Sequence, residues 1–157
     1  MRPILKDTKM TREGETDWLA GFLSRLEKDQ TVAVAAEVDG RFVGQSEVAP
    51  KRGRSKHVRV LGVSLKEGYR DIGIGTELMR EVENQAPRLG IEIITLGLFA
   101  SNARGLHLYE KMGYREVGRV LRGNMMDGEY IDDIMMAKEI PPGSPRGERN
   151  LLKRVDS

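Results

Sequence analysis

The chain has 157 residues with 39% hydrophobic and 32% charged side chains, a length and composition typical of one folded domain. Its net charge of +2 comes from residues 141–157, which hold four of the 26 basic and two of the 24 acidic residues, so the body of the chain has no basic excess for nucleic acid. The absence of cysteine excludes disulfides, a thiolate nucleophile and cysteine-ligated zinc, and with only two histidines we expect no metal.

The first third of the chain predicts a helix followed by a β-hairpin. Residues 16–28 carry apolar side chains at helical spacing, namely Trp18, Leu19, Phe22, Leu23 and Leu26. Two β-rich runs follow, Thr31–Val38 and Arg41–Val48. The Asp39-Gly40 dipeptide between them tolerates the positive φ of a tight turn, so we expect the two strands to pair antiparallel.

The rest of the chain alternates strands and helices. After a polar loop at Pro50–Lys56, an apolar strand is expected at His57–Leu65. A helix is expected at Gly73–Ala86, because its apolar residues line one face and Pro87 disfavours further helix. The remaining expected elements are a strand at Ile91–Phe99, a helix at Asn102–Met112, and strands at Tyr114–Leu121 and Tyr130–Lys138.

This order of elements predicts a single α/β (α+β) domain over residues 1–140, with helices flanking a mixed central sheet of about six to seven strands. Residues 141–157 begin with Pro-Pro-Gly-Ser-Pro-Arg-Gly and are expected to form a flexible C-terminal tail. There is no run of 18 apolar residues, and residues 1–10 lack the apolar stretch of a secretory signal. We therefore expect a cytoplasmic protein with no membrane partner.

An anion-binding site is predicted where the strand ending at Leu65 leads into the next helix, at Arg70-Asp71-Ile72-Gly73-Ile74-Gly75-Thr76. The first N–H groups of a helix lack intrahelical acceptors, the helix dipole adds about half a positive charge, and glycine lets a phosphate approach the backbone. Arg70 adds a full cation. These groups together suit a pyrophosphate.

Other interpretations of this segment remain. Its glycines could serve only close packing at the helix start. A Rossmann fingerprint would need a third glycine near Met79, and a Walker loop would need Gly-Lys-Ser/Thr, and neither is present. A basic cluster at Lys51, Arg52, Arg54 and Lys56 could contact phosphate groups or be a solvated loop.

Two sequence blocks resemble the GNAT superfamily of N-acetyltransferases, in that family's order and spacing. Leu-Gly-Val-Ser-Leu-Lys-Glu-Gly-Tyr-Arg-Asp-Ile-Gly-Ile-Gly-Thr-Glu-Leu-Met, residues 61–79, resembles its acetyl-CoA motif. Ala-Ser-Asn-Ala-Arg-Gly-Leu-His-Leu-Tyr-Glu-Lys-Met-Gly-Tyr, residues 100–114, resembles its second cofactor block. Asp-Gly-Glu-Tyr-Ile-Asp-Asp-Ile-Met-Met, from residue 127, resembles its last strand, so the likeness covers about residues 15–140.

The resemblance implies a GNAT-like domain in which two parallel central strands splay apart, with the pantetheine arm of acetyl-CoA in the gap. It assigns backbone contacts with pantetheine to Val63, Ser64 and Leu65. It assigns the pyrophosphate to Asp71, Ile72, Gly73, Ile74, Gly75 and Thr76. It also implies that Asn102 contacts the pantetheine region and that Tyr109 donates a proton to the departing CoA thiolate.

The role of Tyr109 has two alternatives. A phenol has a pKa of about 10 and a thiol of about 8.5, so complete proton transfer to the thiolate is uphill by about 2 kcal/mol. Donation of a hydrogen bond to the developing thiolate is then one alternative. The other is an ordinary tyrosine that packs the helix on the sheet.

The catalytic base is not evident from the resemblance. Gly97 stands where ribosomal-protein acetyltransferases carry a glutamate, and Val60 where members with small substrates often do. Glu47 and His57 are the candidate bases, the alternatives being a surface carboxylate, a solvated strand end, or a water relay from a backbone carbonyl. His107 is interpreted as a packing residue.

The expected reaction is direct attack of a primary amine on acetyl-CoA in a ternary complex. The acceptor is a small molecule or a peptide, and its identity and a homodimer both stay open. Four acidic residues either border the acceptor site or form a charged hairpin in solvent: Asp127, Glu129, Asp132 and Asp133. The alternative functions are a non-catalytic module that binds acetyl-CoA and, less favoured, a nucleic-acid-binding domain.

Overall fold

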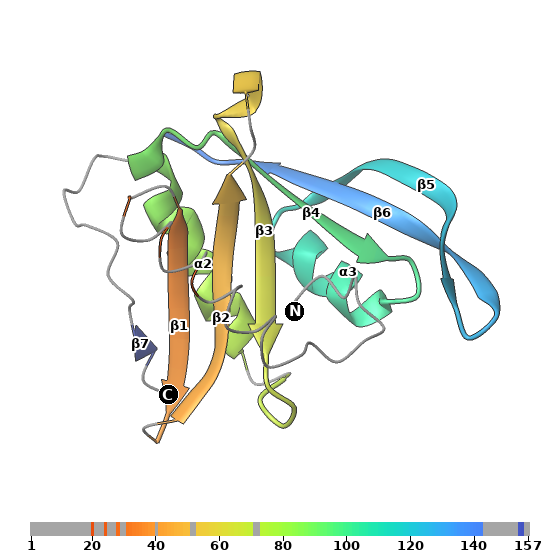
Figure 1. The fold of residues 1–157 in the computed structure, drawn as a ribbon, viewed down its shortest axis with the longest axis horizontal. Coiled ribbons are helices and arrows are strands. Elements are labelled where there is room, and N and C mark those ends of the chain that lie inside the picture. Colours follow the sequence, from red (N-terminus) through yellow and green to blue (C-terminus); the bar gives the residue numbers. More distant parts are fainter. Residues whose placement is uncertain are drawn as a thin grey trace.

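A computed structural model describes residues 31–39, 41–50, 53–70, 73–142 and 154–155, with the single residues 20, 24 and 28 (Figure 1). The elements are β1 (Val32–Val38), β2 (Arg41–Pro50), η1 (Gly53–Ser55), β3 (Val58–Leu65), α2 (Ile74–Gln85), η2 (Ala86–Leu89), β4 (Ile93–Phe99), α3 (Ala103–Lys111), β5 (Arg115–Met126), β6 (Glu129–Glu139) and β7 (Arg154–Val155). Most of the helix expected at residues 16–28 lies outside the described residues, although Ala20 and Ser24 are helical.

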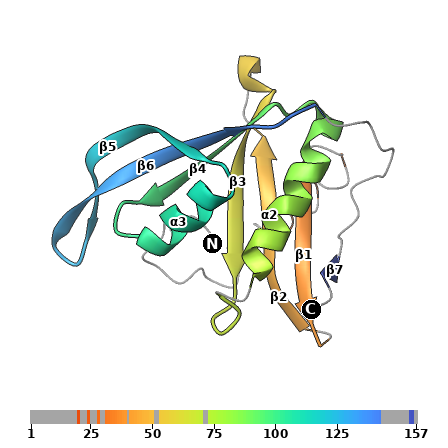
Figure 2. The ribbon, with the colours of Figure 1, turned by 180° about the vertical axis from the view of Figure 1, so that it is seen from behind.

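The strands form one mixed sheet in the order β5-β6-β4-β3-β2-β1-β7. Strands β3 and β4 are parallel, as are β1 and β7, and the remaining neighbours are antiparallel. Figure 2 shows α2 and α3 on the same face of the sheet, which leaves the opposite face of β3, β4 and β6 without a described helix. This mixed α/β architecture confirms the fold class predicted from the sequence.

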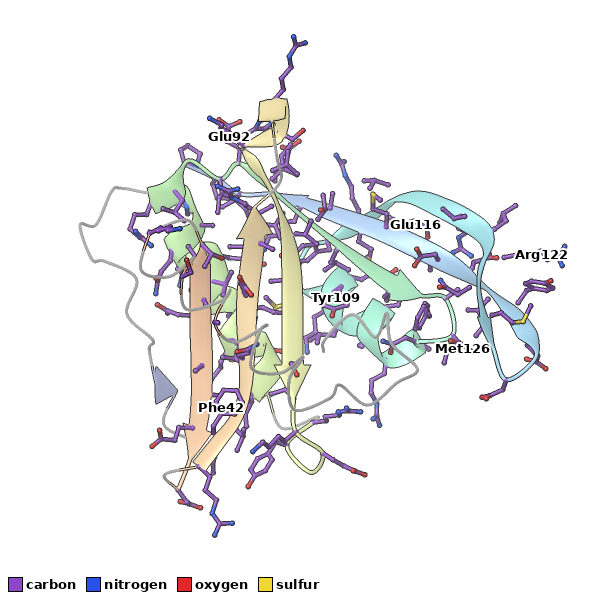
Figure 3. All side chains as sticks on the ribbon, in the orientation of Figure 1. Phe42, Glu92, Tyr109, Glu116, Arg122 and Met126 are labelled. Atoms are coloured by element: carbon purple, nitrogen blue, oxygen red, sulfur yellow. The ribbon has the colours of Figure 1, made fainter. Side chains whose placement is uncertain are left out.

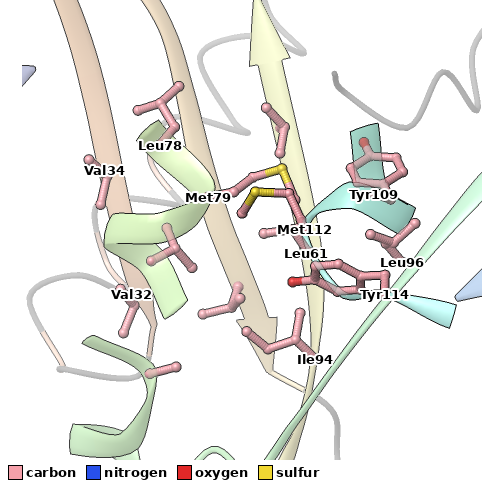
Figure 4. Close-up of a cluster of buried hydrophobic side chains, with 14 of the residues drawn as sticks. Val32, Val34, Leu61, Leu78, Met79, Ile94, Leu96, Tyr109, Met112 and Tyr114 are labelled. Atoms are coloured by element: carbon pink, nitrogen blue, oxygen red, sulfur yellow. The ribbon is translucent and has the colours of Figure 1, made fainter. Parts of the chain in front are cut away.

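The hydrophobic core lies between α2 and the sheet (Figure 4). Helix α2 begins after Gly73 and turns into η2 at Ala86, next to Pro87, as the sequence predicted. Its apolar stripe includes Leu78, Met79 and Val82, which are completely buried. Burying a side chain of this size contributes about 1.5–3 kcal/mol relative to leaving it exposed, so this stripe holds α2 in place.

The hairpin of β5 and β6 is longer than the sequence predicted. Both strands continue to a two-residue turn at Asp127-Gly128, where both residues have positive φ. Positive φ at both positions is the conformation that an Asp-Gly dipeptide tolerates in a tight turn. The pairing shifts register between Val120 and Asn124, and Arg122 has a φ of 54° there, so β5 continues through an irregularity that breaks its alternating pattern.

The parallel strands β3 and β4 separate after a short contact. Their register pairs are Val58 with Ile93, Arg59 with Ile94, and Val60 with Thr95. Beyond these pairs the strands diverge toward their carboxyl ends, and a gap opens between residues 61–65 and the second half of β4 (Figure 2). The splay of the central parallel strands implied by the resemblance is therefore confirmed.

Two residues of the C-terminal segment extend the sheet. Strand β7 pairs parallel with β1, with Arg154 opposite Ala35 and Val155 opposite Ala36. Residues 143–153 and 156–157 lie outside the described residues, so the domain boundary at residue 140 and the flexible tail stay predictions. None of the helices in the described part of the chain is long and apolar enough to cross a bilayer.

Candidate active site

A cavity of about 870 Å³ lies between the unpaired part of β3, the start of α2 and the length of α3. Strand β3 contributes Val63 and Leu65 to its wall. The segment that leads into α2 and the start of α2 contribute Arg70, Gly73, Gly75, Thr76 and Met79. The α3 segment contributes Ser101, Asn102, Ala103, Arg104, Gly105, His107, Leu108, Tyr109 and Lys111.

The α2 end of the cavity has the geometry of an anion site. Gly73 caps the helix at a φ of 86°, a left-handed conformation that strains other residues, and no side chain hydrogen-bonds there as a cap. The first N–H groups of α2 therefore have no side-chain acceptor from the cap. Ile74 is buried, so only its backbone can serve a ligand. Asp71 and Ile72 lie outside the described residues.

Strand β3 forms the second wall. Val63 and Leu65 line the cavity, and Ser64 lies between them on the opposite face of the strand. Residues 61–65 pair only with β2, because the pairing with β4 ends at Val60. Since backbone groups of a strand point alternately to its two edges, part of this segment presents amide groups to the gap. These are the groups that an extended pantetheine arm would require.

Asn102 lines the cavity and also caps α3. Its side-chain oxygen accepts a hydrogen bond of 2.9 Å from the N–H of Gly105. A Cβ on Gly105 would lie 2.6 Å from the Asn102 amide nitrogen, so the cap requires glycine at that position. The predicted contact residue is thus held in place by the helix that it begins.

Tyr109 lies on α3 at the cavity wall and is only 8% exposed (Figure 3). Burial raises the pKa of its phenol above the ordinary value, so the hydroxyl stays protonated at neutral pH. Its ring meets the ring of Tyr114 edge to face, with centroids 6.1 Å apart. The N–H of Tyr114 also donates to the carbonyl of Tyr109 at 2.9 Å.

A polar network behind Tyr109 fixes the end of α3. The Tyr114 hydroxyl donates to Glu83 at 2.9 Å, and Lys138 Nζ donates to the other oxygen of Glu83 at 2.7 Å. Lys138 also donates to the carbonyl of Met112 at 2.8 Å, at the carboxyl end of α3. Burial, and then the charge of Glu83, raise the pKa of Tyr114 far above its ordinary value. The network ties α3 to α2 and β6.

We expect Lys138→Met to lower the free energy of unfolding by about 1–3 kcal/mol, because Glu83 loses a charged donor in a partly buried place. Urea denaturation measures this loss. Arg119→Met is the control, since Arg119 pairs with Glu116 and Asp132 on the exposed surface, where such pairs contribute little. Equal stability of the wild type and Lys138→Met would show that the network does not hold α3.

The two candidate bases lie in different places. Glu47 lies on β2 opposite Gly62 of β3, beside the gap, and accepts a hydrogen bond of 3.3 Å from the Thr31 hydroxyl. His57 precedes β3 at the end where β3 and β4 are paired, and its carbonyl accepts from the N–H groups of Glu92 and Ile93. It is five residues, or about 16 Å, from Gly62 along the strand, so the structure does not bring it to the gap.

Other charged groups of interest lie away from the cavity or are engaged. Asp132 accepts from the backbone N–H of Arg122 and from Arg119, and these donors, the backbone first, lower the pKa of its carboxyl. Arg54 and Lys56 belong to the loop before β3, at the opposite end of that strand from the cavity (Figure 1). Lys51 and Arg52 lie outside the described residues.

Several cavity residues were not predicted as site residues. His107 is exposed on the cavity wall rather than packed in the core. Arg104 and Lys111 also line the cavity, and their spacing of seven residues places them on one face of α3. That spacing was the available signal, but it gains meaning only when α3 is known to flank the gap.

A helix start without a side-chain cap, beside a gap between splayed strands, is the arrangement expected of a protein that binds an extended, anionic ligand. The sequence profile of the acetyltransferase (GNAT) family matches residues 2–114. An N-alpha-acetyltransferase from Sulfurisphaera tokodaii is 33% identical over 132 residues, which cover 74% of each chain. This chain therefore belongs to the GNAT family and is an acetyltransferase.

Two further comparisons extend this result. An L-amino acid N-acetyltransferase from Escherichia coli is 29% identical over 107 residues, which cover 67% of this chain and 66% of that protein. A Salmonella typhimurium protein solved with its cofactor acetyl-CoA superposes with a TM-score of 0.73. It is 16% identical, and the superposition covers 90% of this chain and 83% of that one, so this likeness shows the fold.

Proposed function

We propose that this enzyme transfers the acetyl group of acetyl-CoA to a primary amine by direct attack in a ternary complex. The observation that carries the proposal is the single cavity that joins the start of α2, the open edge of β3 and Tyr109. Acetyl-CoA has three parts that match these features. Its charged diphosphate matches the start of α2, its extended pantetheine arm matches the open edge of β3, and its thioester matches Tyr109. The relative solved with acetyl-CoA supports the choice of donor.

Different residues would bind different parts of acetyl-CoA. Backbone N–H groups at Gly73–Thr76 would bind the diphosphate with Arg70, and the resemblance adds Asp71 and Ile72. Val63, Ser64 and Leu65 would pair with the pantetheine arm through backbone groups. Asn102 would contact the arm from the α3 side. The diphosphate would thus lie at the wide end of the gap and the thioester near its narrow end.

The chemistry follows from this arrangement. The amine nitrogen attacks the thioester carbonyl, a C–N bond forms, the C–S bond breaks, and the sulfur leaves as a thiolate. Tyr109 would donate its proton, or a hydrogen bond, to that sulfur. The proton of the attacking amine would pass to Glu47 through water. Because the chain has no cysteine, a cysteinyl acetyl-enzyme is excluded.

An α-amine is the acceptor that this site favours. At pH 7 an α-amine with a pKa of about 8 is about a tenth neutral, whereas a lysine amine with a pKa of about 10.4 is neutral in only about one part in a few thousand. The Glu47 carboxylate beside the gap gives modest help and suits the easier case. The names of two relatives, an N-alpha-acetyltransferase and an L-amino acid N-acetyltransferase, agree with this choice.

Glu47→Gln is expected to lower the rate most at low pH. Below the amine's pKa of about 8 the variant lacks a proton acceptor, and we expect a loss of about tenfold to a hundredfold in kcat/KM. Above that pH the amine is already neutral, so the deficit should shrink. Rates of thiol release between pH 6 and 9.5 measure this, with Glu129→Gln at the exposed hairpin turn as the control. A deficit that does not change with pH would remove Glu47 from proton transfer.

The proposal as a whole is tested by calorimetry and thiol release on the same protein. Binding of CoA and acetyl-CoA, followed by thiol release with at least one α-amine, supports it. Binding without turnover on any amine would favour a non-catalytic acetyl-CoA module. No heat with either coenzyme would overturn the assignment of the cavity.

A further inference from the structure

The sheet face opposite α2 and α3 has two glycines at the opening of the gap. Gly62 and Gly97 each stand two residues past the last β3–β4 pair, Val60 with Thr95. The intervening Leu61 and Leu96 are buried in the core, so the two glycines face away from the helices.

Packing does not require glycine at either position. A Cβ added at Gly62 would have its nearest neighbour, the carbonyl oxygen of Glu47, at 4.0 Å, and one at Gly97 would meet the carbonyl oxygen of Ile134 at 3.9 Å. Among the described residues, no side chain lies within 4 Å of a Cβ at either position, which leaves an opening at the narrow end of the gap. An acceptor can reach a thioester in the gap through this opening.

Next to the opening lies an exposed methionine between two glycines. Met135 of β6 is paired with Gly97 of β4 on one side and with Gly118 of β5 on the other. Its neighbours Ile134 and Met136 are buried, which places Met135 on the face opposite α2 and α3, where the residue is 52% exposed. The exposed thioether, with a glycine on each side, forms a small apolar surface, which we call the Met135 slot.

The Met135 slot and Glu47 lie on opposite sides of the opening. Glu47 is paired with Gly62 on the β2 side, and Met135 is paired with Gly97 on the β6 side. Adjacent strands are about 4.8 Å apart, so the distance from the opening to Met135 is about the distance from an α-amine to the end of its own side chain. One amino-acid residue can place its nitrogen over the gap and its side chain on Met135.

We propose that the Met135 slot selects the acceptor, and that the acceptor is an α-amine with a large, flexible apolar side chain on its α-carbon, such as methionine or leucine. The inference rests on the proposed function, because it requires that the acceptor enters through the opening. Apolar contact with an exposed thioether favours such a side chain over a small or charged one. Asp133, the next residue of β6 on this face, adds repulsion against acidic side chains.

A free amino acid and a peptide amino terminus both present an α-amine with a side chain on its α-carbon. They differ at the carboxyl group, which is charged in the amino acid and an amide in the peptide. Glu47 and Asp133 repel that charge, whereas Arg115, paired with Ala137 on the same face, attracts it. Both sources therefore enter the experiment as separate arms.

The experiment measures kcat/KM by thiol release. One arm uses tetrapeptides that differ only in the first residue, which is methionine, leucine, serine, glycine or aspartate, and the other arm uses the same five free amino acids. We expect wild-type enzyme to prefer methionine and leucine over glycine and aspartate by at least about tenfold within one arm. Met135→Gln, which keeps the length of the side chain and makes it polar, should lower that preference about tenfold and leave the affinity for acetyl-CoA unchanged.

Met125→Gln is the matched control. Met125 is 56% exposed on the same hairpin, but it is paired with Tyr130 and lies on the other face, far along the strands from the gap. It should leave the preference unchanged. Gly97→Val adds a second test, because the Cβ fits the strand while the branched side chain covers the opening. It should raise KM for every acceptor about tenfold or more without changing the affinity for acetyl-CoA.

The outcomes separate this inference from the proposed function. Turnover of all α-amines without regard to the first side chain would overturn the role of the Met135 slot and leave the proposed function standing. No turnover with any amine would overturn both. If Met135→Gln dissociated a dimer in sedimentation while the preference was unchanged, the slot would be an interface between two copies, and the inference would be wrong.

Discussion

Gly75→Asp is expected to abolish coenzyme binding without unfolding the protein. Gly75 is the second residue of α2, and a Cβ there would meet only Leu65 Cδ1, at an ordinary contact distance of 3.4 Å. An aspartate in the first turn stabilises a helix by about 0.3–1 kcal/mol through the helix dipole. The same carboxylate would stand in the proposed diphosphate site, where two like charges 4 Å apart repel by about 4 kcal/mol. We expect a loss of affinity of about a thousandfold.

Calorimetry with acetyl-CoA measures the affinity, and thermal denaturation measures the fold. Gly75→Ala is the control, because it adds the same Cβ without the charge and should bind within a few fold of wild type. Gly73→Asp should also abolish binding, but at a φ of 86° it costs about 1–3 kcal/mol in backbone strain, so its stability must be measured with its affinity. Undiminished binding by Gly75→Asp would place the diphosphate elsewhere.

The start of α2 was predictable because its signal is local. One short segment contains Gly73 at positive φ, the start of the helix, and Gly75 two residues after Gly73. Helix α2 begins where that segment predicts. The two central strands were predictable for a similar reason, since each is a short apolar run. Their splay was implied by the resemblance, because no pattern within one strand shows where its pairing with another ends.

The proposed acceptor face could not be predicted from the sequence. Glu47, Gly62, Gly97 and Met135 form one row only because of the registers of three separate strand pairs. Register is a tertiary property, and a shift of one residue would turn each of these side chains to the other face. For the same reason His57 and Glu47 were both candidates in the sequence, although five residues of strand separate His57 from the gap.

The hairpin of β5 and β6 shows a different limit. The sequence predicted that the strand ends at Leu121, and the residues that follow include Gly123 and Asn124, which have low β propensity. In the fold, β5 continues to Met126, because it resumes its pairing with β6 from Asn124 onward. The pairing of β5 with β6 outweighs the low local β propensity there. The strand then reaches the Asp127-Gly128 turn, whose dipeptide is visible in the sequence.

Tyr109→Phe is expected to lower kcat by about a hundredfold while the affinity for acetyl-CoA changes less than threefold, because a proton donor to the leaving group acts on the transition state. The ring stays, so its edge contact with Tyr114 and the packing of α3 are preserved. Tyr114→Phe is the matched control. It removes a hydroxyl that donates to Glu83 rather than one at the cavity, and it should lower stability more than kcat.

The pH dependence distinguishes the role of Tyr109 from that of Glu47. Burial raises the pKa of the Tyr109 phenol above its ordinary value of about 10, so the donor form persists through pH 6–9. The ratio of wild-type to Tyr109→Phe rates should therefore be constant over that range, whereas the Glu47→Gln deficit should shrink as pH rises. A higher phenol pKa also makes complete transfer to a thiolate less favourable, which favours hydrogen-bond donation as its contribution. An unchanged kcat in Tyr109→Phe would leave the thiolate to depart unassisted and reduce Tyr109 to a packing residue.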